Sequence, residues 1–238
     1  MTYPRKNLLL LSCEHGGNEV PPGYAALFLG QESLLDSHRG WDPGALELGQ
    51  QMALACAVPL HAATTTRLLV ELNRSIGHRQ LFSEVTRPLA SKLRREIVDT
   101  HYRPHRNAIE GAVAAHIDAG YRVLHIASHS FTHELDGQAR RADVAWLYDP
   151  SRAGEASFTT DWMKDFAPRA PGLRLRRNYP YQGRSDGLMS LLRQRHPDAH
   201  YRGIELEVNQ RFVTQGGAPW EALRRQLVAS LVASLDGA

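Results

Sequence analysis

The sequence predicts a layered α/β fold built on a largely parallel sheet, and three observations support this. Short apolar runs rich in Leu, Val and Ile alternate along the chain with segments of helical periodicity, as in strands joined by crossover helices. Several of the apolar runs are continuous, as strands buried on both faces are. With 238 residues, 42% hydrophobic and 22% charged, the chain has the size and composition of one globular domain over residues 1–238.

Seven short segments are predicted to be strands because they are rich in branched apolar residues. They are residues 7–13, 60–64, 68–72, 122–128, 143–148, 173–177 and 203–208. In the sixth segment, Arg174 and Arg176 alternate with leucines, which is typical of a half-buried strand whose arginines face solvent.

Helices are predicted between and after these strands. Residues 43–57 place apolar side chains at helical spacing, and the helix would begin with Asp42 as N-cap and a proline in its first turn. Residues 87–118 have the same periodicity, and Pro104 should kink or split that helix. Residues 219–235 carry a leucine at every fourth position from 223, which predicts one core-facing stripe.

Charge and hydropathy exclude several classes of protein. The net charge is only +3 and the arginines are scattered, so we expect no nucleic-acid-binding surface. No apolar run approaches the ~20 residues needed to span a bilayer, and residues 1–7 lack the apolar core of a signal peptide. We therefore expect a cytosolic (cytoplasmic) protein with no membrane partner. Cys13 and Cys56 are too few for a disulfide framework and are expected to be reduced thiols.

The chemically informative residues lie at strand ends, where ligands bind in open α/β sheets. The first predicted strand runs into Glu14, His15, two glycines and, after Asn18, Glu19. Two glycines beside a histidine would let the backbone approach a ligand, and a carboxylate four positions on could share a metal with the imidazole. A tight turn carrying a solvated histidine is the alternative interpretation of this motif.

A second histidine stands at the exit of another predicted strand. His129 follows residues 122–128, whereas His125 lies deeper in that strand and is expected to be a hydrogen-bonded core residue. Hydrolytic zinc sites commonly take two histidines and one carboxylate and leave a position for a water whose pKa falls to ~7. His15 and His129 are therefore candidate zinc ligands, and Glu19 and Asp42 compete for the carboxylate position.

Two further strand ends carry polar residues. Asn73 and Arg74 leave an apolar run, and the pair would make a good carboxylate clamp, with Arg67 upstream; a surface turn is the alternative. Glu205 and Glu207 share one face of the last predicted strand, where buried charges are costly unless they have partners. One of these two glutamates is expected to be functional, as the general base of an amide hydrolysis.

Together these motifs resemble the N-formylglutamate amidohydrolase family. The resemblance spans nearly the whole chain and is carried by residues 12–21, 41–45, 71–75, 129–131, 141–143, 178–181 and 206–209. It implies a single amidohydrolase domain with a three-layer α/β/α fold and a central mixed, largely parallel sheet, similar to that of zinc carboxypeptidases and aspartoacylase.

The resemblance also implies roles for individual residues. His15 and His129 would bind one zinc ion, and Glu207 would act as the general base. Aspartoacylase-like enzymes carry the metal carboxylate three residues after the first histidine, where this chain has asparagine. Glu19, one place later, is the first candidate for the third ligand, and Asp42, at a recurrent acidic position of the family, is the second.

The implied reaction is hydrolysis of the N-formyl, or a related N-acyl, amide of an acidic amino acid, such as N-formylglutamate in histidine degradation. Arg74 would be a catalytic and substrate-binding residue, helped by Asn73 and by Arg67 or Arg141. Another N-acyl amino-acid hydrolase or a carboxypeptidase-like amidase is an alternative, since the family includes members with other substrates. A protein that captures an anionic amino-acid derivative without turnover is a further alternative, opposed by the negative charge of Glu207.

Overall fold

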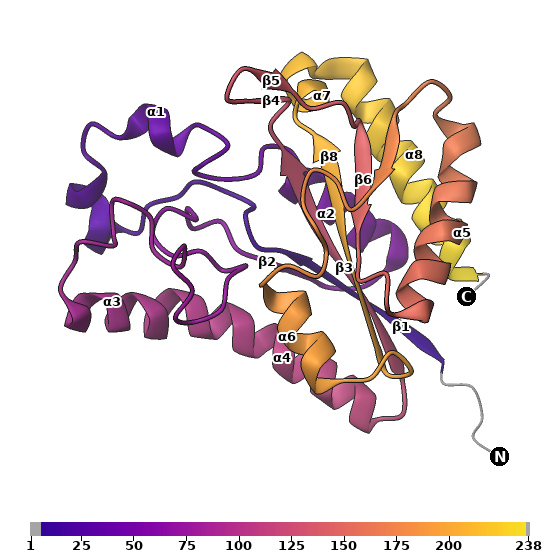
Figure 1. Cartoon of the computed structure of the whole chain (residues 1–238), viewed down its shortest axis with the longest axis horizontal. Coiled ribbons are helices and arrows are strands. Elements are labelled where there is room, and N and C mark those ends of the chain that lie inside the picture. The colour runs from indigo at the N-terminus through magenta and orange to yellow at the C-terminus, as the bar shows by residue number, and fades with distance from the viewer. Residues whose placement is uncertain (1–5, 237–238) are drawn as a thin grey trace.

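A six-stranded sheet runs through the molecule (Figure 1) in the computed structural model, which describes residues 6–236. The strands are β1 (Asn7–Cys13), β2 (Leu60–Ala62), β3 (Arg122–Phe131), β6 (Val144–Leu147), β7 (Leu175–Arg177) and β8 (Tyr201–Asn209). Their order is β2-β1-β3-β8-β6-β7. The first four are parallel, β6 is antiparallel to β8, and β7 is parallel to β6. The predicted mixed, largely parallel sheet is thus confirmed.

Helices cover both faces of this sheet and complete the three layers (Figure 1). One face is covered by α2 (Ala45–Cys56), α5 (Ala153–Arg169) and α8 (Gly217–Asp236), and the other by α4 (Arg103–Asp118) and α6 (Leu188–Arg195). The shorter elements are η1 (Pro22–Phe28), α1 (Glu32–Leu35), α3 (Ser91–Ile97), η2 (Val98–Tyr102), α7 (Arg211–Gln215) and the hairpin β4 (Glu134–Leu135) and β5 (Gln138–Ala139). No helix within residues 6–236 is long and apolar enough to cross a bilayer.

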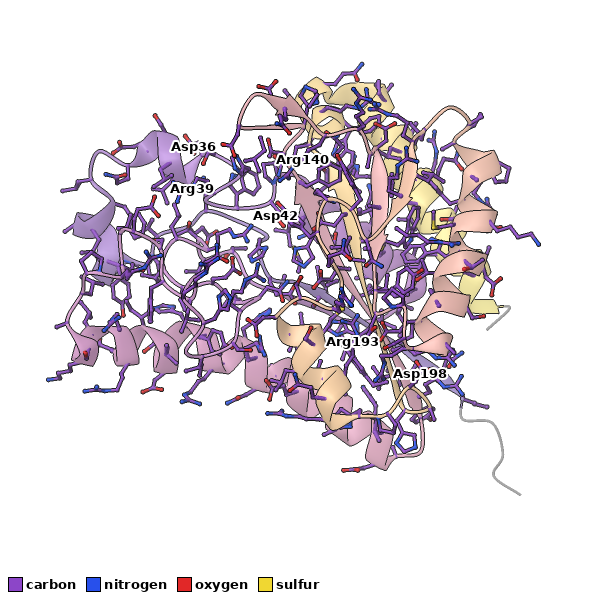
Figure 2. All side chains as sticks on the ribbon, viewed as in Figure 1. Asp36, Arg39, Asp42, Arg140, Arg193 and Asp198 are labelled. Carbon is purple, nitrogen blue, oxygen red and sulfur yellow. The ribbon has the colours of Figure 1, made fainter. Side chains whose placement is uncertain are left out.

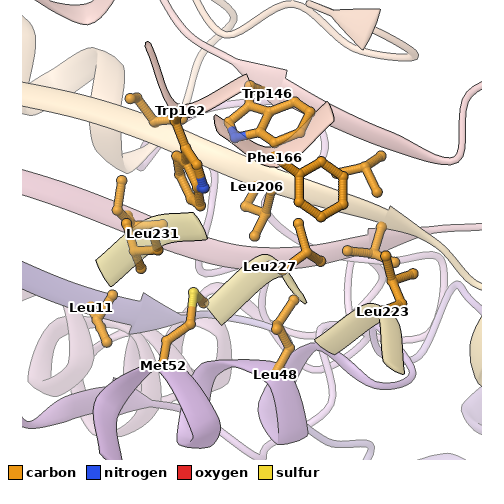
Figure 3. Packing of buried hydrophobic residues seen from close by; sticks show 14 of the residues in the cluster. Leu11, Leu48, Met52, Trp146, Trp162, Phe166, Leu206, Leu223, Leu227 and Leu231 are labelled. Atoms are coloured by element: carbon orange, nitrogen blue, oxygen red, sulfur yellow. The ribbon is translucent and has the colours of Figure 1, made fainter. Parts of the chain in front are cut away.

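The strand β1 shows why its sequence is a continuous apolar run. Leu9 and Leu11 pack into the large cluster beneath α2, α5 and α8, which also holds Trp146 and Trp162 (Figure 3). Leu10 points to the opposite face and packs in a smaller cluster with residues of α4 and α6. Because successive side chains of a strand alternate between faces, a strand covered on both sides needs apolar residues at every position.

The predicted long helix over residues 87–118 is divided near Pro104, as expected. Helix α3 ends at Ile97, the π-helix η2 occupies Val98–Tyr102, and α4 begins at Arg103 with Pro104 in its first turn. Proline has no N–H to donate and its ring crowds the preceding turn. A first helical turn tolerates both features, and the wider π geometry precedes it.

The predicted strand at residues 68–72 is wrong. This segment forms turns, with the Leu69 N–H bonded to the carbonyl oxygen of Thr66. Its apolar side chains are nevertheless buried, because Leu69 and Leu72 join a second cluster with residues of η1 and α3. An apolar run of five residues therefore reported burial correctly and secondary structure incorrectly.

The predicted N-cap of α2 is also wrong. The helix begins at Ala45 and its N-cap is Gly44, whose φ of 80° is in the left-handed region that favours glycine. No side chain caps this end. The carboxylate of Asp42 is therefore available for other contacts, and it turns towards the end of β1.

Candidate active site

The carboxyl ends of β1, β3 and β8 meet at one edge of the sheet and present polar side chains to one cavity. His15 follows β1 by two residues, while His129 lies inside β3, which extends further than predicted. In the parallel pair of β3 and β8, His129 is directly opposite Glu207. Asp42, between the sheet and the irregular segments beside it (Figure 2), completes the group. All four residues line a cavity of ≈ 530 Å³.

His15, Asp42 and His129 bring three possible metal-ligand atoms together. The Nδ1 atoms of His15 and His129 lie 3.2 and 2.9 Å from the same oxygen, Oδ2 of Asp42. The three residues are buried, and each offers one possible ligand atom within 4.8 Å of those of the other two. Two imidazole nitrogens and one carboxylate oxygen are a common donor set of hydrolytic zinc sites. The group therefore fits a single divalent cation.

Each histidine of this group is backed by a second carboxylate. The Nε2 atom of His15 lies 2.5 Å from Oε1 of Glu71, and Nε2 of His129 lies 3.1 Å from Oε2 of Glu14. When Nε2 carries the proton and donates it to a carboxylate, the lone pair of Nδ1 faces the metal position. Glu71 is itself held by Arg67, whose Nη2 lies 2.6 Å from Oε2.

The charges around the two rings favour positive charge between them. Burial lowers the pKa of His129, but contacts with Asp42 and a second carboxylate raise it well above its usual value. Burial and a nearby guanidinium lower the pKa of His15, yet the charges of Glu71 and Asp42 raise it overall. Burial would raise the pKa of Asp42, whereas the two histidines hold it well below its usual range. Surroundings that stabilise protons on these rings also stabilise a bound cation.

Glu207 is a buried carboxylate that lies opposite His129 on the neighbouring strand. Its side chain is 5% exposed, and its Oε2 atom has no hydrogen-bond partner within residues 6–236. Burial, with smaller contributions from Asp42 and Glu205, raises the pKa of Glu207 to about 8. A carboxylate with a raised pKa and a free oxygen can accept a proton from a water molecule in the cavity.

The predicted clamp residues Asn73 and Arg74 both line the cavity but are differently engaged. Asn73 Nδ2 donates to Glu205 (3.2 Å), and its Oδ1 accepts from the N–H of Leu188 (3.0 Å), so both ends of the amide are used. Arg74 Nη1 donates to the carbonyl oxygens of Asn73 (2.8 Å) and Asp186 (2.9 Å). In the described part of the chain, the Nε and Nη2 atoms of Arg74 make no hydrogen bond, so this side can receive a ligand.

Three predicted site residues lie in other surroundings. Arg67 lines the cavity but bridges two site carboxylates, with its Nη1 3.0 Å from Oδ1 of Asp42. Arg141 is exposed and does not line the cavity, and its backbone N–H donates to the hydroxyl of Tyr179 (3.0 Å). Glu19 is also exposed, accepts a hydrogen bond from Thr64 (2.7 Å), and is not brought to the two histidines.

The two glycines after His15 approach the chain itself rather than the cavity. The Gly16 N–H donates to the carbonyl oxygen of Ala63 (2.9 Å), and a Cβ added to Gly17 would lie 2.7 Å from that of Thr64. The expectation that these glycines admit a ligand is therefore wrong. They let the His15 loop lie against the segment after β2.

Sequence reasoning gave no role to Glu14, Glu71 or His105. His105 Nε2 lies 3.8 Å from Oε1 of Glu14, which is 1% exposed. The two glutamates carried a signal, because each is an acid next to or inside an apolar run that leads to a proposed site residue. His105 lies in α4 and its sequence surroundings gave no such signal. His125, by contrast, is hydrogen-bonded to Ser12 and Tyr201 in the core, as predicted.

An α/β/α protein with a free buried carboxylate opposite a possible metal group has the features of a hydrolase, and comparison with known proteins agrees. The family model for N-formylglutamate amidohydrolase matches residues 8–214. The chain therefore belongs to the N-formylglutamate amidohydrolase family, whose members hydrolyse amide bonds, as the sequence motifs predicted.

Two solved structures share its fold. One is a gene product of Agrobacterium tumefaciens, with a TM-score of 0.81 and 23% identity over 98% of this chain and 92% of that one. The other is the N-formylglutamate amidohydrolase of Ralstonia eutropha JMP134, with a TM-score of 0.71 and 19% identity over 98% of this chain and 95% of that one. No curated protein sequence matches the chain.

Proposed function

We propose that this chain is a zinc-dependent hydrolase that cleaves the N-formyl, or a related N-acyl, amide of an amino acid, and that residues 1–238 form one domain. Family membership supports the amide chemistry. The observation that carries metal dependence is the convergence of Nδ1 of His15 and Nδ1 of His129 on Asp42. When bound there, a divalent cation supplies a Lewis acid for the acyl carbonyl and lowers the pKa of a water ligand.

Glu207 is the proton carrier in this proposal. It lies opposite His129 on the adjacent strand and lines the same cavity, and its Oε2 has no hydrogen-bond partner among the described residues. Glu207 accepts the proton of the attacking water and delivers it to the departing amine nitrogen, so that one carboxylate serves both transfers. The products are the free amino acid and the acid of the acyl group.

Arg74 binds the substrate carboxylate. Its Nη1 bonds to two carbonyl oxygens fix the guanidinium, and Nε and Nη2 remain as a pair of donors suited to a carboxylate. Asn73 stabilises the wall of the cavity by its hydrogen bonds with Glu205 and Leu188 and does not bind the substrate. Arg67 stabilises the negative charges of Asp42 and Glu71.

A matched pair of variants tests the metal proposal. Zinc content and the release of formate from N-formyl amino acids are measured for the wild type, Asp42→Asn and Glu19→Gln. We expect the wild type and Glu19→Gln to retain zinc and activity, and Asp42→Asn to lose both, because Asp42 contacts both histidines whereas Glu19 bonds to Thr64. Undiminished turnover of the wild type after complete removal of metal would contradict the proposal.

A further inference from the structure

The cavity contains more carboxylates than its proposed chemistry needs. It is lined by five acidic residues, Asp42, Glu71, Asp186, Glu205 and Glu207, and by two arginines, Arg67 and Arg74. Three of the acids belong to the group around His15 and His129, where a metal and proton transfer would use them. The others, Asp186 and Glu205, belong to the part of the cavity wall that also carries Arg74.

Arg67 is not available to a substrate carboxylate. Its Nη1 lies 3.0 Å from Oδ1 of Asp42, and its Nε and Nη2 lie 2.8 and 2.6 Å from Oε2 of Glu71. All three nitrogens of this guanidinium therefore face carboxylates of the protein. Arg74 is left as the arginine of the cavity wall that can receive an anionic group.

Asp186 and Glu205 are held by neutral donors rather than by cations. The carboxylate of Asp186 accepts hydrogen bonds from the backbone N–H (2.9 Å) and hydroxyl (2.5 Å) of Ser75, and Glu205 accepts one from Asn73 (3.2 Å). Neither acid forms an ion pair with any residue between 6 and 236. Both are partly exposed to the cavity, so their negative charge remains available.

The segments that carry these two acids both contact Asn73. Asn73 donates to Glu205 and accepts from the N–H of Leu188, and a Cβ added to Gly187 would lie 2.6 Å from Oδ1 of Asn73.

With Arg74, the two acids leave one net negative charge on this wall. A substrate carboxylate bound at Arg74 adds another, and a second carboxylate in the substrate would add a third with no cation to meet it.

We propose that the substrate is the N-acyl derivative of an amino acid with a cationic side chain. Its α-carboxylate binds Arg74, and its side-chain ammonium or guanidinium is met by Asp186 and Glu205. This inference rests on the proposed hydrolase function and differs from N-formylglutamate, whose side-chain carboxylate would face the two acids. Like charges that meet in a binding site are a strong means of excluding a ligand.

Kinetics over a matched panel test this substrate class. The zinc-loaded protein is assayed with the N-formyl derivatives of arginine, lysine, glutamine and glutamate. We expect kcat/KM for the arginine and lysine derivatives to exceed that for the glutamate derivative about 100-fold, with glutamine between them. A glutamate or glutamine derivative that is hydrolysed as well as the arginine derivative would overturn the inference and leave the hydrolase proposal standing.

Charge-neutral variants locate the preference. Glu205→Gln and Asp186→Asn each keep an oxygen that can accept a hydrogen bond but remove the charge. Each should therefore lower the ratio of kcat/KM for the arginine derivative to that for the glutamate derivative about 10-fold. The control Glu19→Gln, an exposed acid outside the cavity, should keep the wild-type ratio. If both cavity variants keep the wild-type ratio, the assignment of these two acids is wrong.

Binding of the free amino acids separates the two proposals. Calorimetric titration with arginine and with glutamate, each a possible product, requires no turnover. Tighter binding of arginine, weakened in Glu205→Gln, supports the inference even for a preparation that hydrolyses nothing, in which case only the hydrolase proposal fails. Equal or tighter binding of glutamate overturns the inference.

Discussion

Two buried clusters of charged side chains touch the strand β8, and their carboxylates are engaged differently. Near its amino end, Glu155 accepts hydrogen bonds from Arg193 (2.9 Å) and from the N–H of Gly203 (3.1 Å), while Arg193 also donates to backbone carbonyl oxygens. Near its carboxyl end, Glu14 and Glu207 keep oxygens without a regular hydrogen bond. Figure 2 labels Arg193 of the first cluster and Asp42 of the candidate active site, and the two residues lie apart in that view.

This difference distinguishes an ion pair whose groups satisfy each other from carboxylates whose oxygens are free to meet a ligand. Buried polar atoms are normally hydrogen-bonded, so buried oxygens without a partner in the protein are candidates for contact with a bound ligand. The paired cluster should therefore contribute to folding, and the cluster with unpaired oxygens to binding and catalysis. The predictions below test that division, beginning with the largest expected effect.

Glu207→Gln should lower kcat about 10²–10⁴-fold with the best N-formyl substrate, because the proposed proton carrier is lost. The raised pKa has a second consequence for the metal-free protein. Protonated Glu207 is favoured in the folded state, so its stabilising contribution is present below the unfolded pKa near 4.5 and is lost as the pH rises through about 8. Urea unfolding across this range should show that slope in the wild type and not in the variant. Unchanged turnover would remove Glu207 from the mechanism.

Glu155→Gln should destabilise the fold by about 3–5 kcal/mol, because it leaves Arg193 buried without its counter-charge. Zinc bound per folded molecule should stay at the wild-type value, since Glu155 belongs to the other cluster. Urea unfolding and metal analysis of the folded fraction measure the two quantities. Loss of zinc without loss of stability would contradict the division between the clusters.

Glu14→Gln should weaken zinc binding about 10–100-fold, because the negative charge 3.1 Å from Nε2 of His129 is lost. The stability of the metal-free protein should fall far less than in Glu155→Gln. Competition with a chelator gives the affinity, and Glu155→Gln serves as the buried control. Wild-type affinity in Glu14→Gln would show that the His129 ring is oriented by other contacts.

Glu19→Gln should have the smallest effect, within about 0.5 kcal/mol in stability and with unchanged zinc affinity. Its side chain is exposed and bonded to Thr64. A loss of zinc in this variant, measured in the same chelator competition, would return Glu19 to the ligand set in place of Asp42.

Local patterns predicted most of the sheet, since each depends on residues close in sequence. The strand Asn7–Cys13 has the predicted bounds, whereas β3 was predicted to end just before His129 and continues to Phe131. Residues 68–72 were misassigned as a strand. An apolar run indicates that a segment is buried, and this buried segment forms turns. The Glu71 N–H bonds to the carbonyl oxygen of Leu81, a contact that no local pattern encodes.

The third metal-ligand candidate shows the same limit. Proximity in sequence favoured Glu19, yet its backbone forms a bridge with Thr65 and its side chain turns outward. Asp42 comes from further along the chain and is held by the bond from its N–H to the carbonyl oxygen of His15 (2.9 Å). The folded backbone, and not the spacing of residues, decides which carboxylate meets the histidines.

The direct pairing of His129 with Glu207 on neighbouring strands has a consequence for how the enzyme can diversify. The spacing between these two residues is set by the backbone ladder of the sheet, whereas Arg74 and Asp186 stand on connecting segments. Connecting segments tolerate substitution and insertion far better than central strands do. Exchanging the segments around Arg74 and Asp186 should therefore change which acylated amines the protein accepts and leave the spacing of His129 and Glu207 unchanged.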